Sequence, residues 1–423
     1  MSTIVKRKVS GWLILLLITP IYFYANLQKV IIPGAAFDEL QQVFSLDAAG
    51  VTRLGALFLG IYAAAQLIIG VLVDRYGGAR VIICGGLFFC IGSLVSAFES
   101  SLYMLYFARI ITGAGAASIY LSMVKEIGRV SGSMLPTVLG VATIIGYSGS
   151  ITGASPFIAG VDKFGYFPMV MAAGIGVLIS YLIYTTVALK DDFPTVKRDV
   201  KFSLPAYLKV FSKRQNCCLM ISVGISFGTY FALQSTVGKK FLEDFCGLSG
   251  RSAGIVLTVT MIIAAVNGLV VADISRWCGN RRHPVILFSG FGCLTGAALV
   301  FTGVLLPGGW VWLPVTGMIL MAFAGNVSPI FVASLKESNE ENCFGTVVCV
   351  CNGFAYAVSA IFSGGAGRLM DIYAPQIVDG VRVYSRDSYL LVWGMLVVLG
   401  GISAVLSLFH QETSGRNIPD KIR

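Results

Sequence analysis

The sequence is poor in charge and in the residue patterns that common enzymes need. Only 12% of its 423 residues are Asp, Glu, Lys or Arg, whereas charged residues make up about a quarter of a typical soluble chain. It has two histidines, His283 and His410, and ten cysteines without the paired spacing of a zinc site. It also lacks an H-E-x-x-H pattern and a phosphate-binding P-loop. These absences exclude a water-soluble enzyme, and we predict no enzymatic activity, no cofactor, no metal and no nucleic-acid partner.

The sequence instead has long apolar runs. Hydrophobic residues make up 56% of the chain, and the runs between charged residues approach the ~20 residues that cross a bilayer as a helix. We therefore predict an all-α membrane protein, embedded in the lipid bilayer, with twelve transmembrane helices. The predicted spans are residues 10–32, 51–73, 81–98, 101–124, 134–160, 167–189, 217–238, 253–272, 284–306, 310–335, 344–364 and 389–409.

The basic residues predict the orientation of these spans. Most of the 31 Lys and Arg residues fall between spans on the side that the amino terminus would occupy. Short loops rich in Lys and Arg stay on the cytoplasmic side of a membrane. We therefore expect both termini to be cytoplasmic, in a plasma or inner membrane.

The longest polar stretch divides the chain into related halves. Residues 190–216 are basic and separate 1–189 from 217–423, each with six predicted spans. Three groups of residues recur in the same order in both halves, which indicates a duplicated six-helix unit. The groups are Tyr24, Leu27 and Gln28 with Tyr230, Leu233 and Gln234; Asp74, Arg75 and Gly77 with Asp273, Arg276 and Gly279; and Lys125 and Glu126 with Lys336 and Glu337. We predict two pseudo-symmetric six-helix bundles joined by a cytoplasmic linker.

The most specific motif follows the second span. Residues 70–80 read GVLVDRYGGAR, a short turn with a carboxylate, basic residues and glycines that allow sharp backbone bends. The G-x-x-x-D-R-x-G spacing resembles the signature loop of the major facilitator superfamily, and ARIITGAGAA in the fourth span is similar to that family's fourth-helix motif. The resemblance covers essentially the whole chain. Two features depart from it: Gly78 and Ala79 stand where a basic residue is usual, and the fifth span lacks the adjacent Gly-Pro pair of the antiporters.

The resemblance implies that two bundles rock around a central cavity and expose it to each side in turn. In such a cycle Asp74 would lie against the positive end of a span in the other half, near Phe344, and hold the cytoplasmic gate shut. The implied gating residues are Gly70, Asp74, Arg75, Gly77 and Arg80. The alternative is a solvated turn that only sets the topology.

Charges inside the predicted spans give the main clue to the substrate. Lys29, Arg53 and Arg109 fall there, and no Asp or Glu lies within the spans as drawn. A charge at the middle of a membrane costs at least ~2.5–3.5 kcal/mol and normally faces water or a partner. An anionic substrate would supply a counter-charge for Arg109. Alternatively, Arg109 braces the bundle through helix carbonyls, and Lys29 reaches the lipid headgroups.

Polar side chains at helical spacing outline a candidate cavity. They come from the first, fourth, seventh and eleventh spans, and each could instead form an interhelical hydrogen bond worth ~0.6 kcal/mol. The predicted substrate-binding residues are Tyr22, Asn26, Lys29, Arg109, Tyr230, Gln234, Asn352 and Tyr356.

These features predict a monomeric secondary active transporter. It would move a small organic anion, such as an organic acid, a sugar acid or a sugar phosphate, by alternating access. Because no ATP-binding loop is present, the drive would be a gradient or exchange, with a coupling proton or a counter-solute. Two alternatives stay open: transport of a neutral or zwitterionic solute such as a sugar or an amino acid, and a non-transporting solute receptor on the same scaffold.

Overall fold

The computed structural model describes residues 10–98, 101–131, 135–190, 208, 210–306, 310–340, 344–378 and 380–416. Within these residues, twelve helical segments are long and apolar enough to cross a membrane, which confirms the predicted number of spans. They are Gly11–Ala35, Ala48–Tyr76, Gly78–Val95, Leu102–Val130, Val138–Phe164, Tyr166–Ala188, Arg214–Asp244, Gly250–Trp277, His283–Leu305, Trp312–Ser338, Thr346–Met370 and Arg386–Ser407.

The chain divides into two compact units. Unit 1 comprises Met1–Ile31 and Leu57–Phe202, and unit 2 comprises Ile32–Ala56 and Ser203–Arg423. The segment that follows the first span, Ile32–Ala56, thus groups with the second half of the sequence. Most of the predicted linker, residues 190–216, lies outside the described residues.

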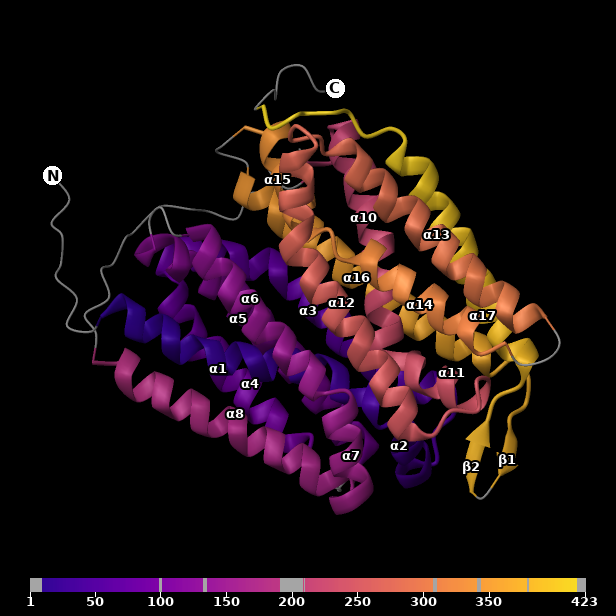
Figure 1. Cartoon of the computed structure of the whole chain (residues 1–423). Helices are drawn as coiled ribbons and strands as arrows, with labels where there is room; N and C mark the ends of the chain where they lie inside the picture. Colours follow the sequence, from indigo (N-terminus) through magenta and orange to yellow (C-terminus); the bar gives the residue numbers. More distant parts are fainter. Residues whose placement is uncertain are drawn as a thin grey trace, which may run out of the picture. The chain divides into compact units, whose positions relative to one another are not determined.

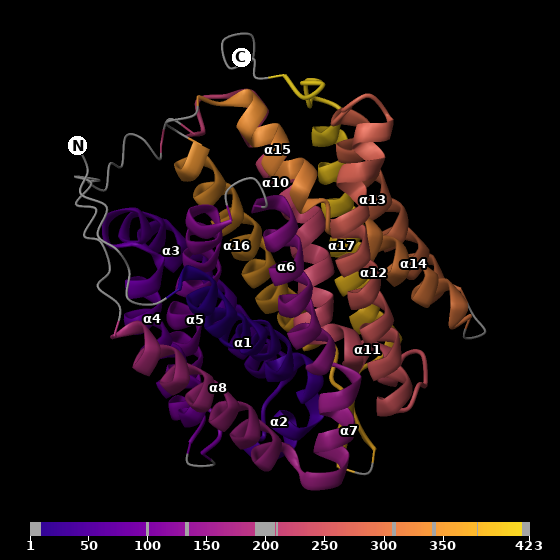
Figure 2. The same cartoon turned by 60° about the vertical axis from the view of Figure 1, so that its left-hand side comes forward.

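Unit 1 is a bundle of helices in which α1 packs against α5, α6 and α8 (Figure 2). The helices are α1 (Gly11–Val30), most of α3 (Ala48–Tyr76), α4 (Gly78–Val95), α5 (Leu102–Val130), α6 (Leu135–Thr152), α7 (Ser155–Phe164) and α8 (Tyr166–Ala188). Glycines let the helices approach closely. A Cβ atom on Gly115 of α5 would lie 2.3 Å from the backbone nitrogen of Phe89 in α4, and one on Gly113 would lie 2.6 Å from the carbonyl oxygen of Phe58 in α3. The G-A-G run in the fourth span therefore serves helix packing.

Unit 2 contains the remaining helices and one short β-hairpin (Figure 1). Its elements are η1 (Ile31–Ala35), α2 (Phe37–Phe44), α10 (Arg214–Ala232), η3 (Leu233–Val237), α11 (Gly238–Asp244), α12 (Gly250–Trp277), α13 (His283–Leu305), α14 (Trp312–Gly325), α15 (Ser328–Ser338), α16 (Phe344–Met370), β1 (Gln376–Val378), β2 (Val381–Val383) and α17 (Arg386–Ser407). The antiparallel strands pair Gln376 with Val383 and Val378 with Val381. The hairpin, α2 and α11 lie at one end of unit 2, and α15 and the described carboxyl-terminal segment lie at the other.

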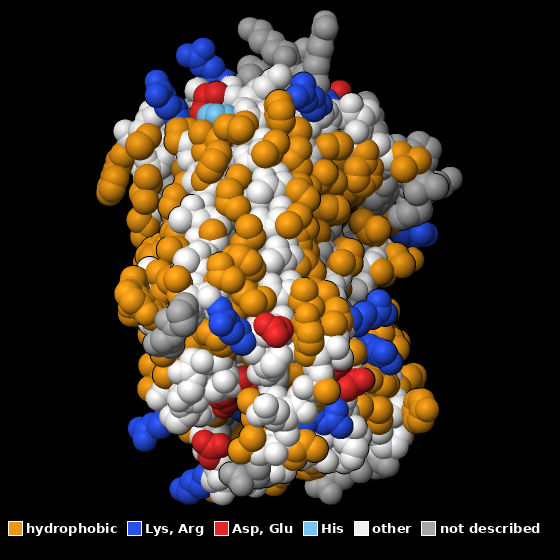
Figure 3. Space-filling view, turned by 90° about the vertical axis from the view of Figure 1, so that its right-hand side faces the viewer, with side chains coloured by type: hydrophobic (Ala, Val, Ile, Leu, Met, Phe, Trp, Pro, Cys, Tyr) orange, Lys and Arg blue, Asp and Glu red, His pale blue; other side chains and the backbone are white. Residues whose placement is uncertain are grey.

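The surface matches a membrane protein. Figure 3 shows hydrophobic side chains over the middle of one face, with Lys, Arg, Asp and Glu side chains gathered toward its upper edge and in its lower part. A band of apolar side chains between two charged zones is the pattern expected for helices that cross a bilayer.

The seventh span runs farther than the sequence predicts. The prediction ends it at residue 238, but the helical segment continues through the π-helical turn η3 and α11 to Asp244. The predicted end of this span is therefore wrong, and Glu243 and Asp244 belong to the same helical segment. The run GKKFLED resembles a loop in the sequence because the side chains that bury it come from distant segments.

The tenth span is broken in a way that leaves its backbone hydrogen-bonded. Helix α14 stops before Asn326, and α15 starts with Pro329 in its first turn. The Asn267 side-chain amide of α12 donates to the carbonyl of Phe323 at 2.7 Å and to that of Asn326 at 3.0 Å. Such replacement partners are what a helix break within a membrane requires.

The carboxyl-terminal segment after α17 is fastened to the start of α13. The Glu412 carboxylate accepts hydrogen bonds from the backbone N–H groups of Arg282 and His283, each at 2.9 Å. His410 is buried and its ring stacks on that of His283, with ring centroids 5.7 Å apart. Burial, reinforced by the neighbouring His283, lowers the pKa of His410 to about 4.

We expect acid to destabilise this end of unit 2 through His410. Because the pKa of the folded-state ring is about 4 and that of an unfolded histidine is ~6.5, the unfolded chain takes up the proton first as the pH falls. Above pH ~6.5 the ring is neutral in the folded and the unfolded state, so its burial costs no protonation free energy. As the pH falls from ~6.5 to ~4, the free energy of unfolding decreases by up to about 3 kcal/mol. The variant His410→Phe should therefore show a shallower fall of the melting temperature than the wild type over this range in detergent. Glu412 is present in both proteins and therefore contributes equally to both slopes. Equal slopes for the two proteins would thus contradict the assignment of the acid sensitivity to His410.

Candidate functional site

Arg109 is the most deeply buried cation of unit 1. Its side chain on α5 is 0% exposed. One Nη atom donates a hydrogen bond to the backbone carbonyl of Gln28 at 3.2 Å, and the guanidinium carbon lies 4.3 Å from the centroid of the Phe58 ring. The contact with a helix carbonyl is the one that a bracing role requires. A guanidinium held in this way still carries five N–H donors and its full charge.

Gln28 lies in the last turn of α1, next to a break in helical geometry. Helix α1 ends at Val30, and Ile32 leaves helical geometry with φ −125° and ψ 114°. The next residue, Pro33, has no N–H to donate. The carbonyl that accepts from Arg109 thus belongs to the last turn of α1, directly before this break in helical geometry.

Lys29, the residue after Gln28 on α1, is a second buried cation. Its side chain is 4% exposed, so it does not take the alternative position at the headgroups. The Lys29 Nζ atom lies 4.4 Å from the centroid of the Tyr62 ring, and the Tyr62 and Phe58 rings stack with centroids 6.3 Å apart. Two neighbouring rings of α3 thus each hold one buried cation. A cation on an aromatic face gains roughly 0.5–2 kcal/mol or more.

Phe58 and Tyr62 are missing from the predicted site residues. Their i, i+4 spacing in the second span is the available signal, because it places both rings on one face of the helix. Nothing in a single sequence shows that this face meets Arg109 and Lys29.

Tyr22 and Asn26 lie on α1, two turns and one turn before Lys29 respectively. The Tyr22 ring is buried and stacks on Tyr120 of α5, with centroids 5.8 Å apart. Asn26 donates to the carbonyl of Tyr22 at 2.9 Å. Gly146 of α6 makes room for both side chains, because a Cβ there would lie 2.2 Å from the Tyr22 ring and 2.9 Å from the Asn26 amide nitrogen. Tyr120, a further aromatic hydroxyl, is also absent from the predicted site residues.

The glutamines of the internal repeat are buried and incompletely hydrogen-bonded. Gln28 is 0% exposed, and neither its amide oxygen nor its amide nitrogen has a partner among the described residues. In unit 2, Gln234 donates to Thr260, whereas its amide oxygen is buried without a partner among the described residues. Buried polar atoms without partners are uncommon in native structures, so each amide is a candidate for a contact with a solute or with water.

The other predicted residues of unit 2 lie in two environments. Tyr230 is buried against Ala264 and Ala322 on neighbouring helices. Tyr356 is half-buried, and its ring meets Phe227 and Phe231 edge-on, with centroids 5.4 and 5.8 Å away. Asn352 lies one turn before Tyr356 on α16 and is half-buried. Unit 2 therefore presents an aromatic group rather than a second pair of cations at these positions.

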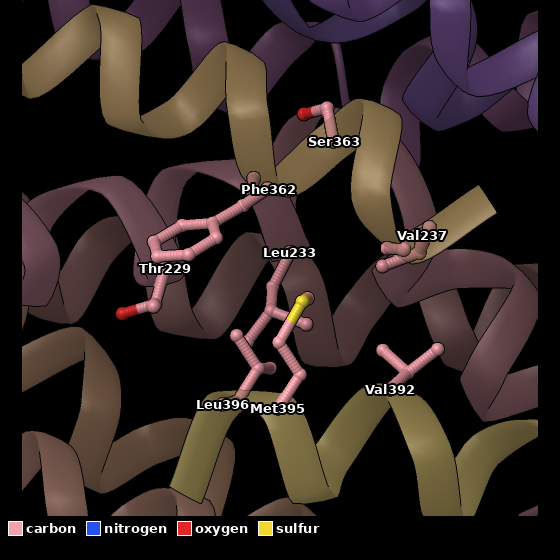
Figure 4. A pocket seen from close by; sticks show the side chains of 10 residues that line it. Thr229, Leu233, Val237, Phe362, Ser363, Val392, Met395 and Leu396 are labelled. Atoms are coloured by element: carbon pink, nitrogen blue, oxygen red, sulfur yellow. The ribbon is translucent and has the colours of Figure 1, made fainter. Parts of the chain in front are cut away.

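A small pocket in unit 2 does not suit a polar solute. It lies among α10, η3, α16 and α17, and Figure 4 shows Leu233, Phe362 and Met395 among its lining residues. Thr229 and Ser363 provide its hydroxyl groups, which are bonded within the protein to Ile225 and Thr236. The space measures about 240 Å³ including its open mouth and has room for about one water molecule.

The signature loop is built from glycines and one carboxylate. Gly77 has a φ of +83°, a conformation that L side chains rarely adopt. A Cβ on Gly78 would lie 2.4 Å from the carbonyl oxygen of Ser122, so a larger residue cannot stand where the family usually has a basic one. The next residue, Ala79, donates its backbone N–H to Glu126 at 3.2 Å. The unusual Gly78-Ala79 pair thus lets the start of α4 pack against α5.

The gating residues stand in and around this turn. Asp74 forms an ion pair with Lys125, so that the end of α3 is tied to α5 within unit 1. Arg75 is exposed and lies over the Tyr76 ring at 5.3 Å. Gly70 and Arg80 are half-buried, on α3 and α4 respectively. The predicted contact of Asp74 with the start of the eleventh span stays a prediction.

Several known proteins are similar to this chain. It is 25% identical to human monocarboxylate transporter 11 over 281 residues, which is 64% of this chain and 57% of that protein. It is 26% identical to multidrug resistance protein 2 of Bacillus subtilis over 357 residues, 78% of this chain and 84% of that protein. The chain thus spans less than two thirds of the human relative.

Solved structures share the fold at low sequence identity. The D-xylose-proton symporter matches with a TM-score of 0.71 and 14% identity, over 97% of this chain and all of that chain. A peptide transporter in complex with sulfate matches with a TM-score of 0.74 and 11% identity, over 96% of each chain. The model of the Major Facilitator Superfamily matches residues 14–364. This match covers most of the chain, and the chain has the twelve-helix fold of the family. The chain therefore belongs to the Major Facilitator Superfamily.

Proposed function

We propose that this protein is a secondary transporter of a small organic anion, with monocarboxylates as the first class to test. The observation that carries the proposal is the pair of buried cations in unit 1, Arg109 and Lys29, seated on the neighbouring rings of Phe58 and Tyr62. Aromatic faces stabilise a cation without cancelling its charge. The interior therefore offers a positive field to a carboxylate.

The buried amide of Gln28 strengthens this site. Its backbone carbonyl accepts from Arg109, while its side-chain amide has no partner among the described residues. A carboxylate that binds Arg109 through charge-assisted hydrogen bonds could also accept from this amide. The human relative named a monocarboxylate transporter supports this solute class.

The transport cycle that we propose is alternating access, driven by a proton or by a counter-solute. The signature loop, with Asp74 tied to Lys125, would stabilise the gate on the side that carries the basic loops. Both termini would be cytoplasmic, in a plasma or inner membrane, and the protein would act as a monomer. Tyr22, Asn26, Tyr230, Gln234, Asn352 and Tyr356 would complete the solute-binding surface.

Arg109 gives the most direct test of the anion proposal. In wild type, a saturating monocarboxylate such as lactate or benzoate should raise the melting temperature, because a ligand at ~100 times its Kd stabilises the protein by ~2.7 kcal/mol. The variant Arg109→Lys keeps the charge but loses the planar fork, and should bind at least ~10-fold more weakly, a loss of ~1.4 kcal/mol. Ligand-dependent thermal shifts in detergent measure both.

The control for this prediction is Arg53→Lys, because Arg53 is an exposed arginine near the amino-terminal end of α3. It should bind the monocarboxylate as the wild type does. A lower melting temperature of Arg109→Lys without ligand, with unchanged affinity, would assign Arg109 to bracing alone. Shifts produced by neutral sugars and not by carboxylates would contradict the anion proposal.

A further prediction concerns the gate. The variant Asp74→Asn should reduce carboxylate flux by about 5–10-fold while shifting the melting temperature by less than ~2 °C, since an exposed ion pair contributes only ~0–1 kcal/mol to stability. The repeat supplies a matched control in Asp273→Asn. Asp273 pairs with Arg276 of its own helix, so its loss unties no two helices and should leave flux near normal. Normal flux in Asp74→Asn would remove Asp74 from the mechanism.

A further inference from the structure

A dense group of charged residues lies at the end of unit 2 that holds α2, α11 and the hairpin (Figure 1). Helix α11 contributes Lys239, Lys240, Glu243 and Asp244, and α2 contributes Asp38 and Glu39. We call these six residues the outer cluster, because this end is the one predicted to be non-cytoplasmic. The proposed function uses none of them.

Lys240 is the centre of the outer cluster. Its side chain is 1% exposed, and its Nζ atom lies 2.7 Å from a carboxylate oxygen of Asp38 and 2.9 Å from one of Asp244. The two aspartates are related by the same sequence spacing as Gln28 and Gln234, so they occupy corresponding positions in the internal repeat. One buried ammonium thus ties the helix after the first span to the end of the seventh span.

Asp244 is surrounded by hydrogen-bond donors. Besides Lys240, it accepts a hydrogen bond from the backbone N–H of Tyr384 and one from the hydroxyl of Tyr389, both at 2.9 Å. Its side chain is 3% exposed. Three donors from three different segments therefore hold this carboxylate in place.

Glu243, the neighbouring carboxylate, is poorly satisfied. Its nearest cation is Lys239, at 3.5 Å from one carboxylate oxygen, and the other oxygen is buried without a hydrogen-bond partner among the described residues. The Asp38 carboxylate repels its charge, whereas Lys239 and Lys240 attract it. When this carboxylate is ionised, its second oxygen carries negative charge in a buried position without a donor among the described residues, and protonation removes that cost.

The charge balance of the whole cluster also favours protonation of one carboxylate. Four carboxylates face two ammonium groups, so the fully ionised cluster would carry an excess of two negative charges. On the hairpin side the cluster contacts Tyr384, whose backbone N–H donates to Asp244. Arg382 and Asp371 also act electrostatically on Tyr384, and because their charges are opposite in sign they offset each other. Tyr389 of α17 donates its hydroxyl to Asp244 and carries no charge. Arg251, at the start of α12, is exposed.

We propose that Glu243 is a proton-binding site, and that its proton is what allows Asp38, Lys240 and Asp244 to lock α2 against α11. This inference rests on the proposed transport function, because it assigns the coupling proton of that cycle to a named carboxylate. When α2 leaves α11, Glu243 meets water and releases the proton. The locked arrangement therefore binds the proton more tightly than the open one, so acid favours the locked arrangement and alkali favours opening.

We choose two native cysteines as probes of this proposed equilibrium. Cys246, two residues beyond Asp244, is 7% exposed in the locked arrangement, and burial raises the pKa of its thiol to about 12. Cys278, at the end of α12, is exposed and serves as an internal reference for the pH dependence of thiol chemistry. The experiment labels the full-length protein in detergent with a hydrophilic maleimide, without solute, and quantifies each cysteine by peptide mass spectrometry.

In wild type, the labelling rate of Cys246 relative to Cys278 should rise at least ~3-fold between pH 6 and pH 8.5. In Glu243→Gln, which imitates the protonated side chain, the ratio should stay at its low value throughout. Asp387→Asn removes an exposed carboxylate outside the cluster on α17 and should follow the wild type. A pH-independent ratio in wild type, or the same rise in Glu243→Gln, overturns the proposal.

The lock itself is tested with Asp38→Asn. This variant weakens the hold of Lys240 on α2 but leaves Lys240 paired with Asp244, so α11 keeps its own ion pair. Labelling of Cys246 should increase at least ~3-fold already at pH 6, and an unchanged rate would show that Asp38 does not lock α2. Because the measurement uses no solute, it stays informative if the anion proposal fails, and the thermal shifts with carboxylates stay informative if the proton proposal fails.

Discussion

The cost of burying charge among apolar helices is the constraint on which this structure depends. Arg109 is completely enclosed in unit 1, where an isolated charge would cost several kcal/mol. The carbonyl of Gln28 and the ring of Phe58 offset that cost. This carbonyl lies in the last turn of α1, directly before the break in helical geometry at Ile32.

The two units solve the same problem with different partners. In unit 1 the cations Arg109 and Lys29 rest on aromatic rings, which stabilise a cation without neutralising it. In unit 2 Lys240 is neutralised by Asp38 and Asp244, which leaves nothing for a ligand and instead fixes α2 to α11. The proposed solute binding and the proposed conformational lock therefore depend on different residues, and each can be changed without the other.

The sequence predicts the periodic features well and the buried ionic contacts poorly. Twelve spans and the family follow from apolar runs of membrane length and from the motif around Asp74, and Arg109 stands out as a cation within an apolar run. The continuation of the seventh span to Asp244 does not follow, because GKKFLED is polar in isolation and becomes buried through α12, α2 and the aromatic residues Tyr389 and Trp393. The roles of Phe58 and Tyr62 do not follow either, since the partners of their rings lie in other helices.

The central claim is that this protein moves an anion rather than only binding one. The most direct measurement is the uptake of a radiolabelled monocarboxylate into proteoliposomes that contain the purified protein, with an acidic exterior as the driving force. We predict saturable uptake above that of protein-free liposomes, with loss of the accumulation when an uncoupler collapses the pH gradient. Binding of the carboxylate to the reconstituted protein without any uptake or exchange would contradict this claim and identify a receptor.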